Sequence, residues 1–178
     1  MEQSEQSKST VSSEFAKLRR AIHQQQAKEL EQRKRDNPQK SKEETMLGVY
    51  VEELEPQVRA AVIELNRKGY PTYSSGFSGK KSDLQTIEGD YKLDEATRNE
   101  LGKMEVDAQV SESWKYKIER HQGIDRSDLP EDAKYTTTIQ FRPTTANLQA
   151  ITDTWNVIAN KFPDRGHFAI PPYPKSKP

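Results

Sequence analysis

Several short segments of this 178-residue chain alternate apolar and polar side chains, and this alternation constrains the fold more than any other feature. The clearest segments are 104–110, 114–118 and 135–141, and weaker ones lie at 72–77 and 85–91. A period of two places successive side chains on opposite faces of a β-strand. Each strand then has one buried and one solvated face, which is typical of antiparallel sheets, whereas parallel strands are usually buried on both faces. The sequence therefore predicts a mostly antiparallel sheet.

Three other segments show helical periodicity. From about Glu55 onward, apolar residues recur at steps of three and four, and Gly69 is placed to end that helix in a left-handed conformation. Asp94 is expected to cap a short helix, and Thr145 is expected to cap a longer one that ends near Phe162. Helices with one apolar stripe cover a sheet with one apolar face, so we predict an α+β two-layer sandwich with the helices on one face.

The segment Ser111-Glu112-Ser113 separates two of the alternating runs and is short enough to close a β-hairpin. In that hairpin Ala108 faces Tyr116. Asp107 then faces Lys117, which is a favourable cross-strand pair. We therefore expect the two flanking runs to be neighbouring strands.

Composition divides the chain into three parts: nine of the first 45 residues are hydrophobic, against 47 of the remaining 133, and residues 163–178 hold five of the ten prolines. We predict a charged arm over residues 1–45, an α+β domain over 46–162 and a Pro-rich tail over 163–178. The arm is expected to be disordered apart from a marginal helix at about 13–35, whose thin apolar stripe buries too little surface to offset the ordering entropy. The apolar points of that helix are Phe15, Leu18, Ile22 and Leu30.

Charge and composition exclude several classes of function. The 28 basic and 28 acidic residues give a net charge of zero, so no overall field attracts nucleic acid or an anionic membrane. Without cysteine there is no disulfide and no thiolate zinc site. No run approaches the roughly 18 consecutive apolar residues of a membrane-spanning helix. No secretory signal is visible, and we expect a cytoplasmic protein without membrane contact.

A string rich in hydroxyls, glycines and lysines runs from Tyr70 to Lys81. Gly76 and Gly79 permit backbone shapes that expose N–H groups, and the lysines add positive charge, a combination that suits a phosphate. The string is not a P-loop, because Ser74 stands where that motif requires its first glycine. The alternative is an ordinary solvated hairpin loop. The candidate ligand-binding residues are Ser74, Ser75, Gly76, Ser78, Gly79, Lys80 and Lys81.

Within this string, the pattern Ser-Ser-x-x-Ser-Gly-Lys over residues 74–80 resembles the Ser-Ser-Cys-Ser-Gly-Arg loop of wybutosine-synthesis tRNA-modifying proteins. The loop of this chain has one additional residue and lacks the cysteine. The resemblance implies RNA binding, with modification of the RNA as the associated activity.

A second polar surface is expected on the sheet. The aromatic residues of the alternating runs share a face with Val106, Ile118 and Ile139, which indicates core side chains rather than stacking platforms for bases. The opposite face is polar and mildly basic, but it lacks the aromatics that single-strand binders use. Its secondary candidate residues are Lys115, Lys117, Thr136, Thr138 and Arg142.

The spacing of ionisable residues contains no catalytic or metal-binding motif. None of His23, His121 and His167 has a ligand spacing such as i, i+4. The acidic segment 125–132 lacks the alternating ligands, central glycine and terminal glutamate of a calcium loop. We expect no metal and no cofactor, and catalytic residues stay unassigned.

Three functions remain open from the sequence. The leading hypothesis is a small non-enzymatic binding or interaction domain with a protein partner. The first alternative is a nucleotide- or RNA-binding protein, with an RNA-modifying activity, that uses the loop at 74–81, although the net charge does not support nucleic acid. The second is a structural subunit that assembles through its N-terminal helix. Pro171-x-x-Pro174 matches a minimal polyproline ligand, but a terminal extension along the surface is the simpler interpretation.

Overall fold

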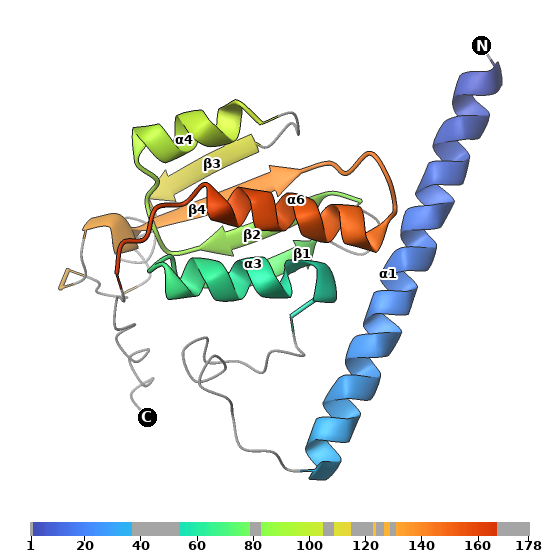
Figure 1. Ribbon diagram of the computed structural model, residues 1–178, viewed down its shortest axis with the longest axis horizontal. Helices are drawn as coiled ribbons and strands as arrows, with labels where there is room; N and C mark the ends of the chain where they lie inside the picture. Colours follow the sequence, from blue (N-terminus) through green and yellow to red (C-terminus); the bar gives the residue numbers. More distant parts are fainter. Residues whose placement is uncertain are drawn as a thin grey trace.

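The computed structural model describes residues 2–36, 54–78, 83–104, 109–114, 123, 127–128 and 131–166. Its elements follow in the order α1 (Glu2–Asp36), α3 (Pro56–Arg67), β1 (Thr72–Phe77), β2 (Gln85–Gly89), α4 (Glu95–Gly102), β3 (Gln109–Trp114), a short 3-10 turn (Glu131–Lys134), β4 (Tyr135–Phe141) and α6 (Leu148–Asn160). The predicted α+β fold class is confirmed (Figure 1).

The four described strands form one sheet in the order β1-β2-β4-β3, and every neighbouring pair is antiparallel. Ile139 of β4 lies between Ile87 of β2 and Val110 of β3. Helices α3 and α6 lie side by side over the sheet (Figure 1). The sandwich with a mostly antiparallel sheet is therefore confirmed.

A continuous cluster of buried side chains fills the space between helices and sheet. Trp155 of α6 is fully buried, and its ring meets Phe141 of β4 edge-on with centroids 4.9 Å apart. Burial of each large apolar side chain contributes roughly 1.5–3 kcal/mol, so this layer stabilises the sandwich. The other large members of the cluster are Phe15, Val58, Val62, Leu65, Tyr70, Ile87, Tyr91, Leu93, Leu101, Ile139, Ile151, Ile158 and Phe162.

Local signals in the sequence place most helix ends correctly. Pro56 occupies the first turn of α3, and Gly69 follows that helix with a φ of 88°. The Asp94 side chain caps α4 by accepting a hydrogen bond from the Thr97 N–H at 2.7 Å. The predicted cap of α6 is wrong: Asn147, rather than Thr145, accepts from the N–H three residues ahead.

The predicted hairpin at residues 111–113 is also wrong. These residues lie inside β3, which pairs along its length with β4. Glu112 faces inward, where its carboxylate accepts hydrogen bonds from the Leu93 N–H at 2.7 Å and from Arg98 at 2.5 Å. Because the carboxylate has these partners, a polar residue is tolerated within the strand and no turn is needed. The predicted partners of that hairpin, Asp107, Ala108, Tyr116 and Lys117, lie outside the described residues.

The N-terminal helix is longer than the sequence predicts and is packed against the domain. It covers residues 2–36 instead of about 13–35. Phe15 is 1% exposed and belongs to the core cluster, and Ile22 is 2% exposed. The apolar stripe of α1, which is too thin to stabilise an isolated helix, is therefore buried against the domain. The predicted boundary at 45/46 and the tail beyond 166 lie outside the described residues.

Candidate helix-docking site

The predicted phosphate loop lies only partly within the described chain. Ser75 and Gly76 belong to β1 together with the backbone of Ser74, and Ser78 follows the strand, whereas 79–82 are not described. The N–H of Phe77 donates to the Glu55 carboxylate at 3.0 Å, and the N–H of Ser78 donates to the Leu84 carbonyl at 2.8 Å. Both N–H groups therefore already have protein acceptors, which does not favour a phosphate at this part of the loop.

The secondary polar face of the sheet carries acidic residues beside the predicted ones. Thr138 donates to Glu88 at 3.2 Å, and Arg142 is paired with Asp83. Thr136 is 9% exposed, so the prediction that it is solvated is wrong; its hydroxyl lies 3.5 Å from Asp90. Within the described part, these carboxylates offset the mildly basic character. The other two predicted residues, Lys115 and Lys117, lie outside the described chain.

A different surface gathers side chains from three elements, at the end of the sandwich where α1 crosses beside α3 and α6 (Figure 1). We call it the docking site, formed by α1 residues 15–29 against Glu55, Arg59 and Phe77. Its apolar centre is Phe15, with Leu18 partly buried against the same core cluster. The Arg19 guanidinium lies 5.5 Å from the centroid of the Phe77 ring, which is a cation–π geometry.

Polar contacts flank the apolar centre of the docking site. Arg59 of α3 is paired with Glu29 of α1. Burial alone would raise the pKa of Glu29, but hydrogen bonds from Arg59 and Gln25 outweigh it and hold this pKa below its ordinary value. His23 Nε2 lies 3.3 Å from the Glu55 carboxylate. These pairs fix where along α1 the domain makes contact.

Glu55 joins all three elements of the docking site. Besides the contact with His23, its carboxylate accepts from Gln57 at 2.6 Å and from the Phe77 N–H of β1. Gly76 makes room for it, because a Cβ at this position would lie 2.3 Å from the Glu55 carboxylate oxygen. Gly76 also has a φ of 114°, a conformation that other residues rarely adopt. Its role in the structure is therefore to admit Glu55.

We expect Gly76→Ala to lower the free energy of unfolding by about 2 kcal/mol, because it adds backbone strain and displaces the Glu55 side chain. Chemical denaturation followed by circular dichroism measures this loss. Gly102→Ala is the matched control, since a Cβ there meets nothing within 4 Å. A loss at Gly102 equal to that at Gly76 would contradict the role assigned to Gly76.

Most of these docking residues escape sequence analysis. The apolar stripe on α1 is visible in the sequence, but Glu55 and Arg59 carry no signal that links them to residues about 30 positions earlier. Among the described residues, no group of three or more His, Asp or Glu side chains is placed to bind a metal ion. Among the described helices, none combines the length and hydropathy needed to cross a membrane.

Comparison with known proteins gives no further constraint: no family model, curated protein or solved structure matches the chain. A functional assignment therefore depends on the geometry of its own residues.

Proposed function

We propose that this protein is a non-enzymatic interaction domain whose docking site binds an amphipathic helix, with α1 as the occupant in its own chain and α1 of a second copy as the occupant in an assembly. The observation that carries the proposal is the seating of α1. Phe15 and Ile22 are almost fully buried, while the polar pairs His23–Glu55 and Glu29–Arg59 connect the helix to α3.

This arrangement follows a common mode of protein recognition, in which a helix inserts anchors spaced by three, four and seven residues into an apolar surface. Phe15, Leu18 and Ile22 have this spacing. The residues between them on the outer faces, such as Lys17 and Arg20, are exposed. The contacts are thus confined to one face, as recognition by a surface requires.

The length of α1 supports exchange between copies. A helix of 35 residues is about 52 Å long, and its N-terminal part extends past the sandwich (Figure 1). Seventeen residues, 37–53, separate α1 from Leu54 in the sequence, and a chain of that length spans at most about 58 Å. The same helix can therefore reach the docking site of its own domain or that of a neighbouring copy, which is the relation found in domain-swapped dimers.

A peptide-binding experiment tests this function. A labelled peptide covering residues 12–36 is titrated into the full chain and into the full chain carrying Phe15→Ala and Ile22→Ala. We expect at least tenfold tighter binding to the double variant, because the tethered wild-type helix competes at a high effective concentration. Fluorescence anisotropy gives the two affinities.

Two controls make the result specific. A peptide that itself carries Phe15→Ala and Ile22→Ala should bind neither protein. A protein with Lys17→Ala and Lys28→Ala, both on exposed positions of α1, should behave as wild type. Equal affinity for the two proteins, or binding of the altered peptide, would rule out helix docking. A molecular mass that stays monomeric in light scattering at all concentrations would rule out exchange between copies.

A further inference from the structure

The face of α1 that meets the domain changes character along the helix. Phe15, Ile22 and Glu29 follow one another at steps of seven residues. Because two turns of an α-helix take about seven residues, these three side chains lie on one face. Phe15 and Ile22 are almost fully buried, whereas Glu29 is partly exposed. This face is therefore apolar at its first two heptad positions and acidic at the third.

The domain presents its contacts in the matching order. Phe15 belongs to the core cluster, and Glu29 is paired with Arg59 of α3. The separation of these two positions of α1 corresponds to about 21 Å along the helix axis. The docking site thus has an apolar end and a cationic end. A helix in the reverse direction would bring its carboxylate to the apolar end.

Both members of this ion pair are positioned by neighbours of their own. In the domain, Arg59 Nε donates to the Leu54 carbonyl at 2.9 Å, and Nη2 donates to Glu29 Oε2. On α1, Gln25 Nε2 donates to Glu29 Oε1 at 2.8 Å. Each carboxylate oxygen therefore has a donor. An arginine that is already anchored on its own domain loses less side-chain entropy when a carboxylate arrives.

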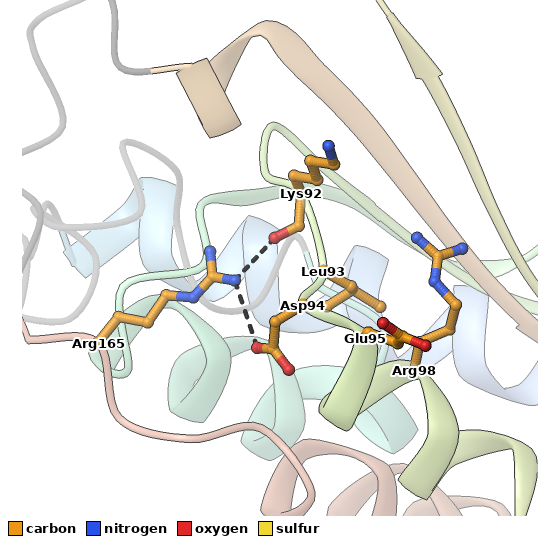
Figure 2. Close-up of a pocket in the computed structure, with 6 residues that line it drawn as sticks. All are labelled: Lys92, Leu93, Asp94, Glu95, Arg98 and Arg165. Atoms are coloured by element: carbon orange, nitrogen blue, oxygen red, sulfur yellow. Dashed lines mark hydrogen bonds and ion pairs between the residues drawn. The ribbon is translucent and has the colours of Figure 1, made fainter.

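Other cations of the domain do not stand in this relation to α1. An open pocket near the N-terminus of α4 contains Arg165, which donates to the Lys92 carbonyl at 2.7 Å, while the Lys92 ammonium points away from Arg165 (Figure 2). Arg98 of the same pocket is paired with Glu112 of β3. Arg59 differs from these residues because its carboxylate partner belongs to α1, so a docking helix supplies it.

The ion pair at Arg59 matters more for selectivity than for affinity. A partly exposed ion pair contributes little net free energy, so the buried apolar anchors supply most of the affinity. A helix with a basic residue in place of the carboxylate would instead set two like charges against each other, and such repulsion discriminates between partners.

We propose that Arg59 is the specificity-determining residue of the docking site. It selects an amphipathic helix that carries a carboxylate seven residues after its second apolar anchor, and it fixes the direction of that helix. The occupant that meets this requirement is α1 of a second copy of this chain. This inference rests on the function proposed above.

The first test measures selectivity among peptides. The full chain carrying Phe15→Ala and Ile22→Ala receives labelled peptides of residues 12–36, either unchanged, with Glu29→Lys or with Glu14→Lys. Glu14 is exposed on α1, so its substitution makes the same change of charge away from Arg59. We expect Glu29→Lys to weaken binding by about tenfold or more and Glu14→Lys to change it by less than about twofold. Fluorescence anisotropy gives the affinities.

Adding Arg59→Glu to this protein should invert the preference, so that the Glu29→Lys peptide binds about fivefold more tightly than the unchanged one. An inverted preference requires a folded docking site and therefore separates selectivity from general loss of structure. If circular dichroism shows that this protein does not fold, Arg59→Gln takes its place and should bind the two peptides within about threefold of each other.

The second test uses full chains and asks whether a second copy is the occupant. One chain carries Glu29→Lys and the other carries Arg59→Glu, so each alone sets like charges against each other at this contact. In a mixture, each helix meets a complementary domain in the other chain. With one chain labelled with 15N, native mass spectrometry should show mixed dimers well above the level of dimers in either chain alone.

The outcomes separate this inference from the proposed function. If the unchanged peptide does not bind at all, helix docking itself fails. If the unchanged and Glu29→Lys peptides bind equally, or Glu14→Lys weakens binding as much as Glu29→Lys, the role of Arg59 is overturned while helix docking stands. Absence of mixed dimers overturns a second copy as the occupant.

Discussion

Replacing Phe15 and Ile22 together with alanine is expected to lower the free energy of unfolding by about 5 kcal/mol. Both side chains are at most 2% exposed, and truncation of a buried Phe costs about 3–5 kcal/mol and of a buried Ile about 2–5. The combined loss of stability from the two substitutions cannot exceed the total free energy of docking of α1. Once that free energy is lost, α1 leaves the domain and no further contact can be lost. Urea denaturation followed by the fluorescence of the buried Trp155 measures the change.

The exposed pair Lys17 and Lys28 on the same helix gives the control, since alanine at both positions should change stability by less than about 0.5 kcal/mol each. If the Phe15/Ile22 variant unfolds at the wild-type urea concentration, α1 contributes nothing to the fold. The charged arm would then be independent of the domain, as hydropathy alone suggests.

Helix α1 shows which features of the fold cannot be predicted from residues close together in the sequence. Its apolar positions could be found from spacing, since Phe15, Leu18 and Ile22 follow a helical period. The surface that contacts this helix could not be found in the same way, because Glu55 and Phe77 are distant from α1 in the sequence and only the fold brings them to it. A thin stripe is unfavourable for an isolated helix but sufficient when a preformed surface receives it.

The elements with strong local signals were predictable. Helix α4 begins where Asp94 can cap it, and α3 begins and ends where Pro56 and Gly69 permit. In each case the decisive interaction is between residues a few positions apart. The cap of α6 was missed because Thr145 and Asn147 are both good caps, and the hydroxyl of Thr145 instead lies 3.3 Å from the Asn147 N–H.

The candidate sites show the opposite case. The open pocket near the N-terminus of α4 takes Lys92, Arg98 and Arg165 from three separate segments, so no spacing in the sequence could reveal it. Gly76 was recognised as unusual for its backbone freedom, and the structure confirms that freedom with its positive φ. The role of Gly76 in making room for the Glu55 side chain was not predictable, because it depends on where the Glu55 carboxylate lies in the fold.

The hairpin error at residues 111–113 has a specific cause. Val110, Glu112 and Trp114 have the same parity, so the alternation continues through Glu112. The turn was predicted because the short polar segment Ser111-Glu112-Ser113 separates two alternating runs. An inward-facing carboxylate inside a strand is costly unless it has partners. Those partners, Leu93 and Arg98, belong to the segment that leads into α4 and to α4 itself.

Glu112→Ala is therefore expected to lower the free energy of unfolding by about 3 kcal/mol. The Glu112 side chain is 12% exposed, and its loss leaves the Leu93 N–H without its acceptor and Arg98 without its partner. A buried unsatisfied donor costs about 1–3 kcal/mol, and hydrogen bonds to charged groups contribute about 1.5–3. Glu112→Gln keeps an acceptor for Leu93 and loses only the attraction to the partly exposed Arg98, so it should cost about 1 kcal/mol.

Ser111→Ala on the exposed face of β3 is the matched control, and it should change stability by less than about 0.5 kcal/mol. An inward-facing carboxylate inside a strand requires that Glu112→Ala lose more stability than Glu112→Gln, and that Ser111→Ala be nearly neutral. In a hairpin turn, Ser111 and Glu112 would both be solvated and both substitutions would be mild. Equal, small losses at the two positions in urea denaturation would therefore argue against the pairing of β3 with β4 through this segment.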